Sequence, residues 1–363
     1  MPHATHPPES DRYLALPKAG ANWDPAMLYT YYHGMHIPEE RIGAYIYFLG
    51  RPTFGVCQGG VLIFQGDQNF DPLDMAYMDY EMTMPWPTVD EKSLTTDNGL
   101  RIEFVELGRT NRLTYTSPNG EASFDLIAEA VTPLYARGHI IPGEDLHGDP
   151  ALTPGGTEQM MHVTGELMLR GKRYDVDCYN PRDRSWRQIR TESKHRRAQI
   201  PTLPPVGWTP MYFGPDLIFN SAGYVSPSTN PNWTGLYDVD PAKPSHYFAW
   251  IMVDGEDLPV TKVIRTVHES HPVLYSAQRQ EVEVEVEGGR RFHFYGETTA
   301  MCNAVAWPNA AIRVGTAHWR SDDGRECDNT YQEMWFDDIY MRTMNERAGQ
   351  RVYRSPAPAP TGV

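Results

Sequence analysis

Many of the short motifs that mark well-known enzyme classes are missing from the sequence. No GxGxxG run follows a strand pattern and no GxxxxGK(S/T) run occurs, which argues against a nucleotide cofactor. GxSxG and HExxH are also absent, so the usual signatures of serine hydrolases and zinc proteases are not met. A hydrolase is therefore the weakest of the candidate functions, because neither its nucleophile nor its metal site can be identified.

Cysteine and paired histidine are scarce, and both absences bear on metal binding. The four cysteines have no CxxC spacing, which argues against a zinc knuckle or a disulfide scaffold and predicts free thiols in a reducing cytoplasm. Two histidines lie close together in HGMH (33–36) and HESH (268–271). Because a zinc site needs three or four ligands at ~2 Å, we expect neither a metal site nor a redox cofactor.

Positive charge and long apolar runs are lacking as well. Lysine and arginine number 32 against 47 acidic residues, a net charge of −15 that disfavours nucleic acid and anionic membrane surfaces as partners. The N-terminus has neither the basic nor the apolar region of a signal peptide. No run approaches the ~20 apolar residues of a membrane span. We therefore expect a cytoplasmic protein without membrane insertion.

The sequence is instead rich in aromatic residues and in period-two alternation. Aromatic residues make up 12% of the chain, which fits a β-rich protein, an apolar ligand site, or both. Asn119–Gly120, Asp254–Gly255 and Gly288–Gly289 provide hairpin turns between alternating segments. Glutamates alternate with valines over residues 281–287, which predicts a half-buried strand whose glutamate face is merely solvated. The whole pattern predicts an all-β antiparallel sandwich or barrel.

The chain divides into two β halves in this interpretation. Helical patterning is scarce, and the best candidate for a short helix lies within residues 331–349. The segment IPTLPPVGWTP is typical of a linker, and both Pro-rich ends of the chain are expected to be poorly ordered. The expected divisions are an N-terminal tail (1–20), a first β domain (21–200), the linker (201–210), a second β domain (211–350) and a C-terminal tail (351–363).

One segment combines a strand pattern with an unusual density of charge. GKRYDVDCYNPRDRSWRQIR (171–190) places an Arg-Asp-Arg triplet beside a serine and a tryptophan, which suits neither a packed core nor a solvated loop. Together with the preceding strand pattern, it resembles the mid-chain signature of the carotenoid 1,2-hydratase-like, lipocalin-like superfamily. The upstream segment YYHGMHIPEERIGAYIYF is similar to the opening of bacterial members. The residues that match the signature are Glu158, Val163–Gly165, Tyr179 and Arg182–Trp186.

The resemblance implies two lipocalin-like antiparallel β-sandwich or barrel halves with few short helices and a ligand pocket at or near their junction. Known members hydrate isolated alkenes of carotenoids, or shape polyene chains in Diels–Alder and other cyclisations. Two positions depart from the signature: Arg187 stands where a glycine usually follows the tryptophan, and Asn180 replaces a second glycine. We expect the pocket entrance or the polar end of the substrate to differ accordingly.

The charged segment also has a chemical interpretation of its own. Protonating an sp² carbon requires an acid shielded from bulk water, and a carboxylate or π face that stabilises the developing cation. Asp183 is the expected catalytic acid or base, its pKa raised by burial against Trp186. Arg182 is expected to position Asp183, with Tyr179 and Trp186 lining the pocket. The sequence leaves open the alternative that Arg182 and Asp183 form a structural ion pair.

Five further residues are candidates for substrate binding. Glu158 and His162 lie four apart in one predicted strand and therefore point to the same face. For His162 and His33 the sequence favours a structural role, as satisfied side chains without chemistry. The remaining candidates, for which the sequence indicates no partner, are His33, Arg187 and His318.

The preferred interpretation is a cofactor-independent lyase or isomerase. It would be a hydratase, dehydratase or cyclase that acts by acid–base chemistry on a hydrophobic isoprenoid-like or polyketide-like substrate between the two β domains. The alternative is a non-catalytic carrier of a hydrophobic small molecule, which lipocalin-like halves would allow. A homodimer is compatible with either function.

Overall fold

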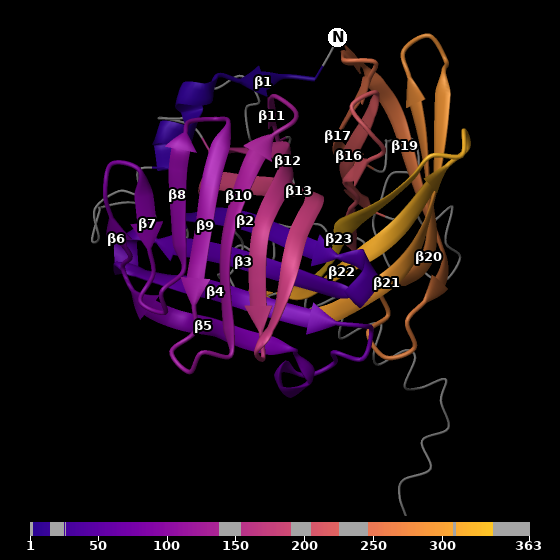
Figure 1. The fold of residues 1–363 in the computed structure, drawn as a ribbon. Coiled ribbons are helices and arrows are strands. Elements are labelled where there is room, and N and C mark those ends of the chain that lie inside the picture. The colour runs from indigo at the N-terminus through magenta and orange to yellow at the C-terminus, as the bar shows by residue number, and fades with distance from the viewer. Residues whose placement is uncertain are drawn as a thin grey trace, which may run out of the picture.

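Two curled antiparallel sheets, one of 13 strands and one of 10, make up the protein (Figure 1). The prediction of an all-β fold is confirmed, and the helical elements in the described ranges are short 3-10 turns. No helix in the described part of the chain is long and apolar enough to cross a membrane. The computed structural model describes residues 3–14, 25, 27–137, 154–189, 205–224, 246–307 and 310–336.

The elements follow one another along the chain with few interruptions. The strands of the first sheet are β1 (Thr5–His6), β2 (Met27–Ile37), β3 (Ile42–Arg51), β4 (Val56–Gln65), β5 (Tyr77–Pro85), β6 (Thr88–Val89), β7 (Ser93–Thr95), β8 (Arg101–Glu106), β9 (Thr110–Thr116), β10 (Ala122–Ala130), β11 (Leu134–Ala136), β12 (Gly155–Leu169) and β13 (Lys172–Ile189). The 3-10 turns are η1 (Pro8–Leu14), η2 (Pro38–Glu40), η3 (Pro52–Phe54) and η4 (Pro72–Asp74). The strands of the second sheet are β14 (Val206–Trp208), β15 (Met211–Tyr212), β16 (Leu217–Tyr224), β17 (His246–Val253), β18 (Glu256–Leu258), β19 (Val260–Ser270), β20 (Ala277–Val286), β21 (Arg291–Trp307), β22 (Ala310–Ser321) and β23 (Glu326–Phe336).

The strand order places the charged segment at the centre of the first sheet. That sheet runs β5-β4-β3-β2-β13-β12-β10-β9-β8-β7-β6, and β11 adds to β12 and pairs with β1. The second sheet runs β18-β17-β16-β14-β23-β22-β21-β20-β19, with β15 beside β16. Strand β13, which carries the Arg-Asp-Arg triplet, therefore lies between β12 and β2.

Strands β2 to β4 are buried on both faces, whereas β9 and β10 are buried on alternate residues only. One face of β2 to β4 covers the core of the first half, for example through Tyr31 and Ile46. The other face packs against the second half, where Tyr45 and Leu62 share an apolar cluster with Val314. A strand buried on both sides needs apolar residues at successive positions, which explains the continuous apolar runs in this part of the sequence.

Hydrogen bonds also join the two halves along β21. The Asn69 side-chain amide donates to the carbonyl oxygen of Met301 (2.9 Å), and the Asn303 amide donates to the carbonyl oxygen of Asn69 (3.1 Å). The Arg41 guanidinium donates to the carbonyl oxygen of Thr299 (2.8 Å). These contacts hold the first sheet against the second and so fix the space between them.

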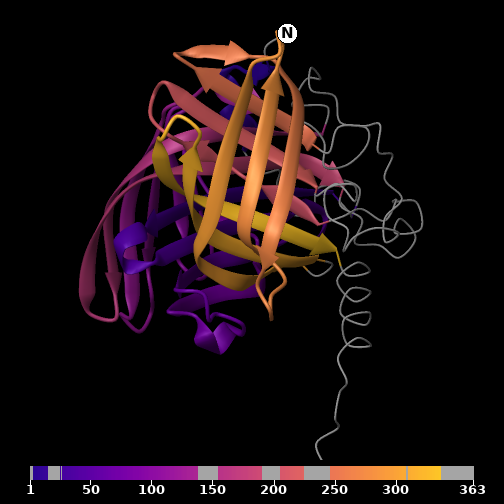
Figure 2. The same cartoon turned by 90° about the vertical axis from the view of Figure 1, so that its right-hand side faces the viewer.

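The predicted hairpins of the second half and its glutamate strand are confirmed. Gly288 and Gly289 have φ of 86° and 81° between β20 and β21, a conformation that glycine adopts without strain. Asp254–Gly255 joins β17 to β18. In β20 the valines at 282, 284 and 286 are buried, and the intervening glutamates are at least partly exposed. Figure 2 turns the orange strands of this half, which include β19 and β20, toward the viewer.

Three details of the predicted organisation differ from the structure. The N-terminal segment forms β1 and η1 because Asp11 is buried against arginines of β13. The second part of the predicted linker is β14, an inner strand whose Gly207 leaves room for the Arg265 guanidinium. Residues 331–336 of the predicted helix belong to β23, whose backbone pairs with β22. The rest of that helix and the C-terminal tail lie outside the described residues.

Candidate active site

A small cavity of about 40 Å³ lies between the two sheets and is lined by residues of both halves. The second half contributes Trp208 from β14 and Gln332 from β23, together with aliphatic side chains. The first half contributes a mixed set of aromatic and charged groups. Its lining residues are Tyr32, Tyr45, Tyr47, Arg137, Glu158 and Asp183.

The register of three neighbouring strands brings the acidic residues together. Asp183 on β13 lies directly opposite Glu158 on β12 and directly opposite Tyr32 on β2. Residues that are directly opposite in an antiparallel pair point to the same face, with Cβ atoms about 4.5–5.5 Å apart. The two carboxyl groups and the tyrosine ring therefore project side by side toward the second half.

Arg137, at the end of β11, is the cation of the site. Its guanidinium donates to Oδ2 of Asp183 at 2.7 Å and to the Ser185 hydroxyl at 2.6 Å. Gly156 makes this approach feasible, because a Cβ there would lie only 2.9 Å from the Arg137 Nε. Only 13% of the Asp183 side chain and 3% of the Arg137 side chain is exposed, so water screens this ion pair weakly.

Glu158 differs from Asp183 in its surroundings. Burial, and next the negative charge of Asp183, raise the pKa of Glu158 well above its ordinary value. Arg137 acts in the opposite direction, as does the Asn220 side-chain amide, which donates to Oε2 of Glu158 at 2.6 Å. The raised pKa favours a protonated Glu158 next to an ionised Asp183, so that one carboxyl can donate a proton and the other can accept one.

The rest of the cavity wall offers π faces and hydrogen-bond donors. Tyr45 stacks on Tyr47 with ring centroids 5.1 Å apart, and Tyr32 meets Trp208 edge to face at 5.3 Å. The Trp208 indole N–H lowers the pKa of Glu158, but by less than Arg137 and Asn220 do. It is buried without a hydrogen-bond partner in the described part of the chain, as is the amide nitrogen of Gln332. The indole faces Glu158 and the Gln332 side chain faces Tyr32, and a ligand oxygen in the cavity could accept from either donor.

Arg182 does not position Asp183 as the sequence predicted, because adjacent strand residues point to opposite faces. Its guanidinium instead donates to Asp11 (2.8 Å) and to Gln159 (2.8 Å) inside the first half. Arg184 pairs with the same Asp11 carboxylate. Burial opposes ionisation of Asp11, but the two guanidinium groups outweigh it and lower its pKa to about 2. The predicted Arg182–Asp183 ion pair is therefore replaced by two separate clusters, one on each face of β13.

Trp186 and Tyr179 also lie away from the cavity lining. Trp186 is buried in the core of the first half and packs on Gly155, where a Cβ would lie 2.8 Å from the ring. Tyr179 stacks between His162 (centroids 4.7 Å apart) and Tyr212 of the second half (3.6 Å). Tyr179 precedes Asp183 by four positions on β13, or roughly 13 Å at 3.3 Å per residue. His162, which contacts Asp177 at 2.6 Å, shares this partly exposed stack.

The remaining predicted site residues occupy three different places. His33 is buried inside the first half, where burial and next the positive charge of Arg182 lower its pKa to about 3. His318 lies on the surface of β22, 3.2 Å from Asp328. Arg187 lies in the register shift of β13 between Ser185 and Gln188 and has φ of 51°, a left-handed conformation that suits the glycine expected at this point of the signature. None of these three lines the cavity.

Two of the predicted site residues, Glu158 and Asp183, thus line the cavity together. Arg137 and Trp208 escaped prediction because each is an isolated residue in a segment without any other chemical signal. The sequence does contain a weak indication of the aromatic cavity wall, because the alternate residues Tyr45 and Tyr47 of YIYF lie on one face of a strand.

The fold is the lipocalin-like one that the sequence resemblance predicted. One solved structure with this fold is a candidate AttH of Nitrosomonas europaea, with TM-score 0.52 and 11% identity; the match covers 85% of this chain and 92% of that chain. Another is kievitone hydratase of Nectria haematococca, with TM-score 0.50 and 13% identity; the match covers 88% of this chain and 96% of that chain. A sequence comparison with curated proteins gives no match. Residues 11–327 match the family described as a domain of unknown function (DUF7064), and the chain belongs to that family.

Proposed function

We propose that the protein is a lyase or isomerase that works by acid–base catalysis in the cavity between its two halves. The observation that carries this proposal is the pairing of two carboxyl groups in unlike surroundings. Glu158 is buried with a raised pKa, whereas Asp183 forms an ion pair with Arg137. Transfer of protons between such groups and a substrate requires no redox cofactor.

Glu158, rather than Asp183, is the proton donor in this mechanism. In a hydration, the Glu158 proton goes to one alkene carbon, and a water molecule attacks the neighbouring carbon as Asp183 accepts its proton. A dehydration that starts from the same protonation state is a different step: Glu158 protonates the hydroxyl, which departs as water, and Asp183 removes a proton from the neighbouring carbon. An isomerisation or cyclisation uses the same donor and acceptor without water. Arg137 stays charged and fixes the Asp183 carboxylate.

The cavity wall favours a compact, oxygen-bearing substrate over a hydrocarbon chain. A volume of about 40 Å³ admits a few non-hydrogen atoms, so it fits the reacting end of a molecule rather than a whole polyene. Trp208 and Gln332 present N–H donors that a hydrocarbon would leave unpaired at a cost of roughly 1–3 kcal/mol each. The tyrosine faces stabilise a planar or cationic centre. We infer that a cyclic, hydroxylated or carbonyl-bearing unsaturated compound is the substrate.

A deuterium-labelling screen tests this function. The protein is incubated in D₂O with cyclic unsaturated phenols and ketones, and mass spectrometry detects gain or loss of water and deuterium at carbon. We expect Glu158→Gln and Asp183→Asn to lower turnover by about 10²–10⁴-fold, the usual contribution of a general acid or base, with ligand binding retained. Glu285→Gln, on the exposed face of β20, is the control.

Two outcomes would argue against the proposal. Full turnover in Glu158→Gln would exclude this residue as the proton donor. A ligand that binds at the cavity and is recovered chemically unchanged, with no deuterium at carbon after long incubation, would favour the alternative of a non-catalytic carrier.

A further inference from the structure

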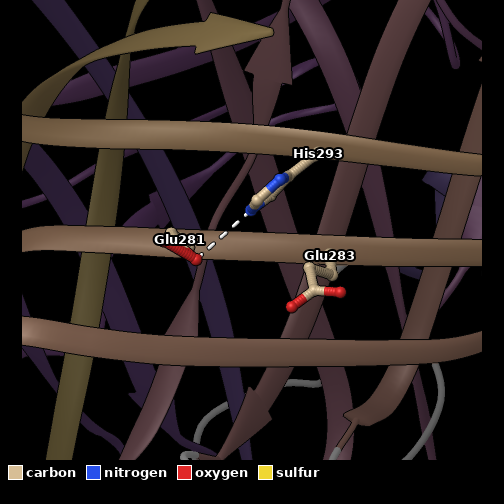
Figure 3. A group of neighbouring side chains, drawn as sticks. All are labelled: Glu281, Glu283 and His293. Atoms are coloured by element: carbon tan, nitrogen blue, oxygen red, sulfur yellow. Dashed lines mark hydrogen bonds and ion pairs between the residues drawn. The ribbon is translucent and has the colours of Figure 1, made fainter. Parts of the chain in front are cut away.

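A second group of chemically reactive side chains lies on the outer face of the second half, on strands β19 to β21, which contribute no residue to the cavity lining. Glu281 and Glu283 of β20 and His293 of β21 bring their carboxylate oxygens and imidazole nitrogens within 4.8 Å of one another (Figure 3). Glu283 is directly opposite His293, and Glu281 is one pair further along the same face. A merely solvated row of glutamates on β20 would need no partner, but here a histidine of the neighbouring strand points into the row.

The orientation of His293 is the most informative feature of this group. Its Nε2 points at the Glu281 carboxylate, 3.3 Å from Oε2. Its Nδ1 lies 3.0 Å from the Tyr295 hydroxyl and 3.9 Å from the Asp322 carboxylate. Histidines that bind metals usually have their second nitrogen held by such a hydroxyl or carboxylate, which fixes the tautomer and leaves the other nitrogen as the ligand.

A further imidazole approaches from the neighbouring strand β19. The Nε2 of His268 lies 2.8 Å from Oε1 of Glu281, so that Glu281 has an imidazole nitrogen beside each of its oxygens. The next glutamate of the row, Glu285, has its own cation, since Arg291 is 3.1 Å away. The Glu283 side chain has no hydrogen bond or ion pair within the described residues and is free to turn toward an ion.

We propose that Glu281, Glu283 and His293 form a binding site for a divalent transition-metal ion such as Zn²⁺, with His268 as a fourth ligand. Zinc takes imidazole nitrogen and carboxylate oxygen at about 2.0–2.2 Å, which places ligand atoms about 3.3–3.6 Å apart in a tetrahedron. The ligand atoms of Glu281, Glu283 and His293 already lie within 4.8 Å of one another, and His268 reaches the group through Glu281. The two carboxylates neutralise the ion, and the imidazoles select for transition metals over Ca²⁺ and Mg²⁺.

The proposed site would add metal–ligand bonds across strands that backbone hydrogen bonds and side-chain ion pairs already join. His268 comes from β19, both glutamates from β20 and His293 from β21, which are consecutive in the second sheet. An ion that binds the folded protein only would stabilise it in proportion to the logarithm of the metal concentration above the dissociation constant. We therefore expect metal to raise the thermal stability of the protein.

Calorimetric titration of the full, untagged chain with ZnCl₂ at neutral pH tests the proposal. We expect one Zn²⁺ to bind per chain, with no comparable binding of CaCl₂. Glu281→Gln and His293→Gln should each weaken the affinity for Zn²⁺ at least tenfold. Two matched controls, Glu285→Gln in the same row and His318→Gln beside a different acidic pair, should leave the affinity within about twofold.

Melting temperature provides an independent readout of the same site. Without metal, all four variants are expected to melt like the unmodified protein, which shows that the substitutions leave the fold intact. With excess Zn²⁺, the melting temperature should rise in the two controls and stay unchanged in Glu281→Gln and His293→Gln. Absence of Zn²⁺ binding, or equal binding by His293→Gln and the controls, would overturn the proposal without bearing on the catalytic cavity.

Discussion

The raised pKa of Glu158 leads to a quantitative expectation for the stability of the protein. In the unfolded chain a glutamate titrates near its ordinary pKa of about 4.3. In the folded protein, burial and next the charge of Asp183 raise the pKa of this carboxyl. Between the two pKa values the folded state holds one proton more than the unfolded state. The free energy of unfolding therefore falls by about 1.4 kcal/mol for each pH unit in this window.

Glu158→Gln removes this titration while keeping the shape of the side chain. Glutamine still offers an oxygen to the Asn220 amide, which donates to Oε2 of the glutamate at 2.6 Å. The favourable contribution of the protonated glutamate is fully present below the ordinary pKa and is lost as pH rises through the raised one. Relative to the unmodified protein, the variant should thus gain about 1.4 kcal/mol per pH unit above pH ~5, until the raised pKa is passed.

Urea denaturation of both proteins at several pH values between 5 and 9 measures the difference. The contributions of unaffected groups to the pH dependence of the free energy of unfolding are the same in both proteins and cancel in the difference. Glu285→Gln on the partly exposed face of β20 serves as the control, and its difference from the unmodified protein should stay small at every pH. If the Glu158→Gln difference were also flat, the glutamate would be ionised in the folded state and could not be the proton donor.

Three further substitutions probe the interior and the interface. Asp11→Ala should lower the free energy of unfolding by about 3–5 kcal/mol, because Arg182 and Arg184 stay buried without their carboxylate. Urea denaturation measures this loss, and a value below about 1 kcal/mol would contradict the argument. Trp208→Phe should raise the dissociation constant of a true ligand about fivefold to tenfold in calorimetric titration by removing one N–H donor, and unchanged affinity would show that the indole makes no such bond. Tyr212→Ala should cost about 1 kcal/mol beyond lost burial in chemical denaturation, because a stack at 3.6 Å across the halves disappears.

The fold class was predictable because its signals are local. Alternation along β9, β10 and β20 and the glycine turns depend on residues that are close in sequence. Which strands become neighbours is not a local property. The pairing of β13 with β2, which brings Asp183 opposite Tyr32, joins segments at opposite ends of the first half. The burial of η1 depends likewise on a distant partner, so its sequence alone resembled a disordered tail.

The site was predicted only in part because the sequence groups Asp183 with Arg182 and Trp186 through their closeness along the chain. Residues that are close along the chain need not point into one pocket. In the observed strand, period two sends Asp183 to the interface and both of its supposed partners into the first half. The true partner, Arg137, comes from β11 and shares no motif with the triplet.

The density of charge in the Arg-Asp-Arg triplet follows from the position of β13 between two interiors. One face of this strand meets the core of the first half, where Arg182 and Arg184 share the carboxylate of Asp11. The other face meets the cavity, where Asp183 is paired with Arg137. Each buried charge thereby lies beside an opposite charge on its own side of the strand, which lowers the cost of its burial. Because both clusters share one backbone, the order of η1 and the orientation of the acidic pair depend on the same strand.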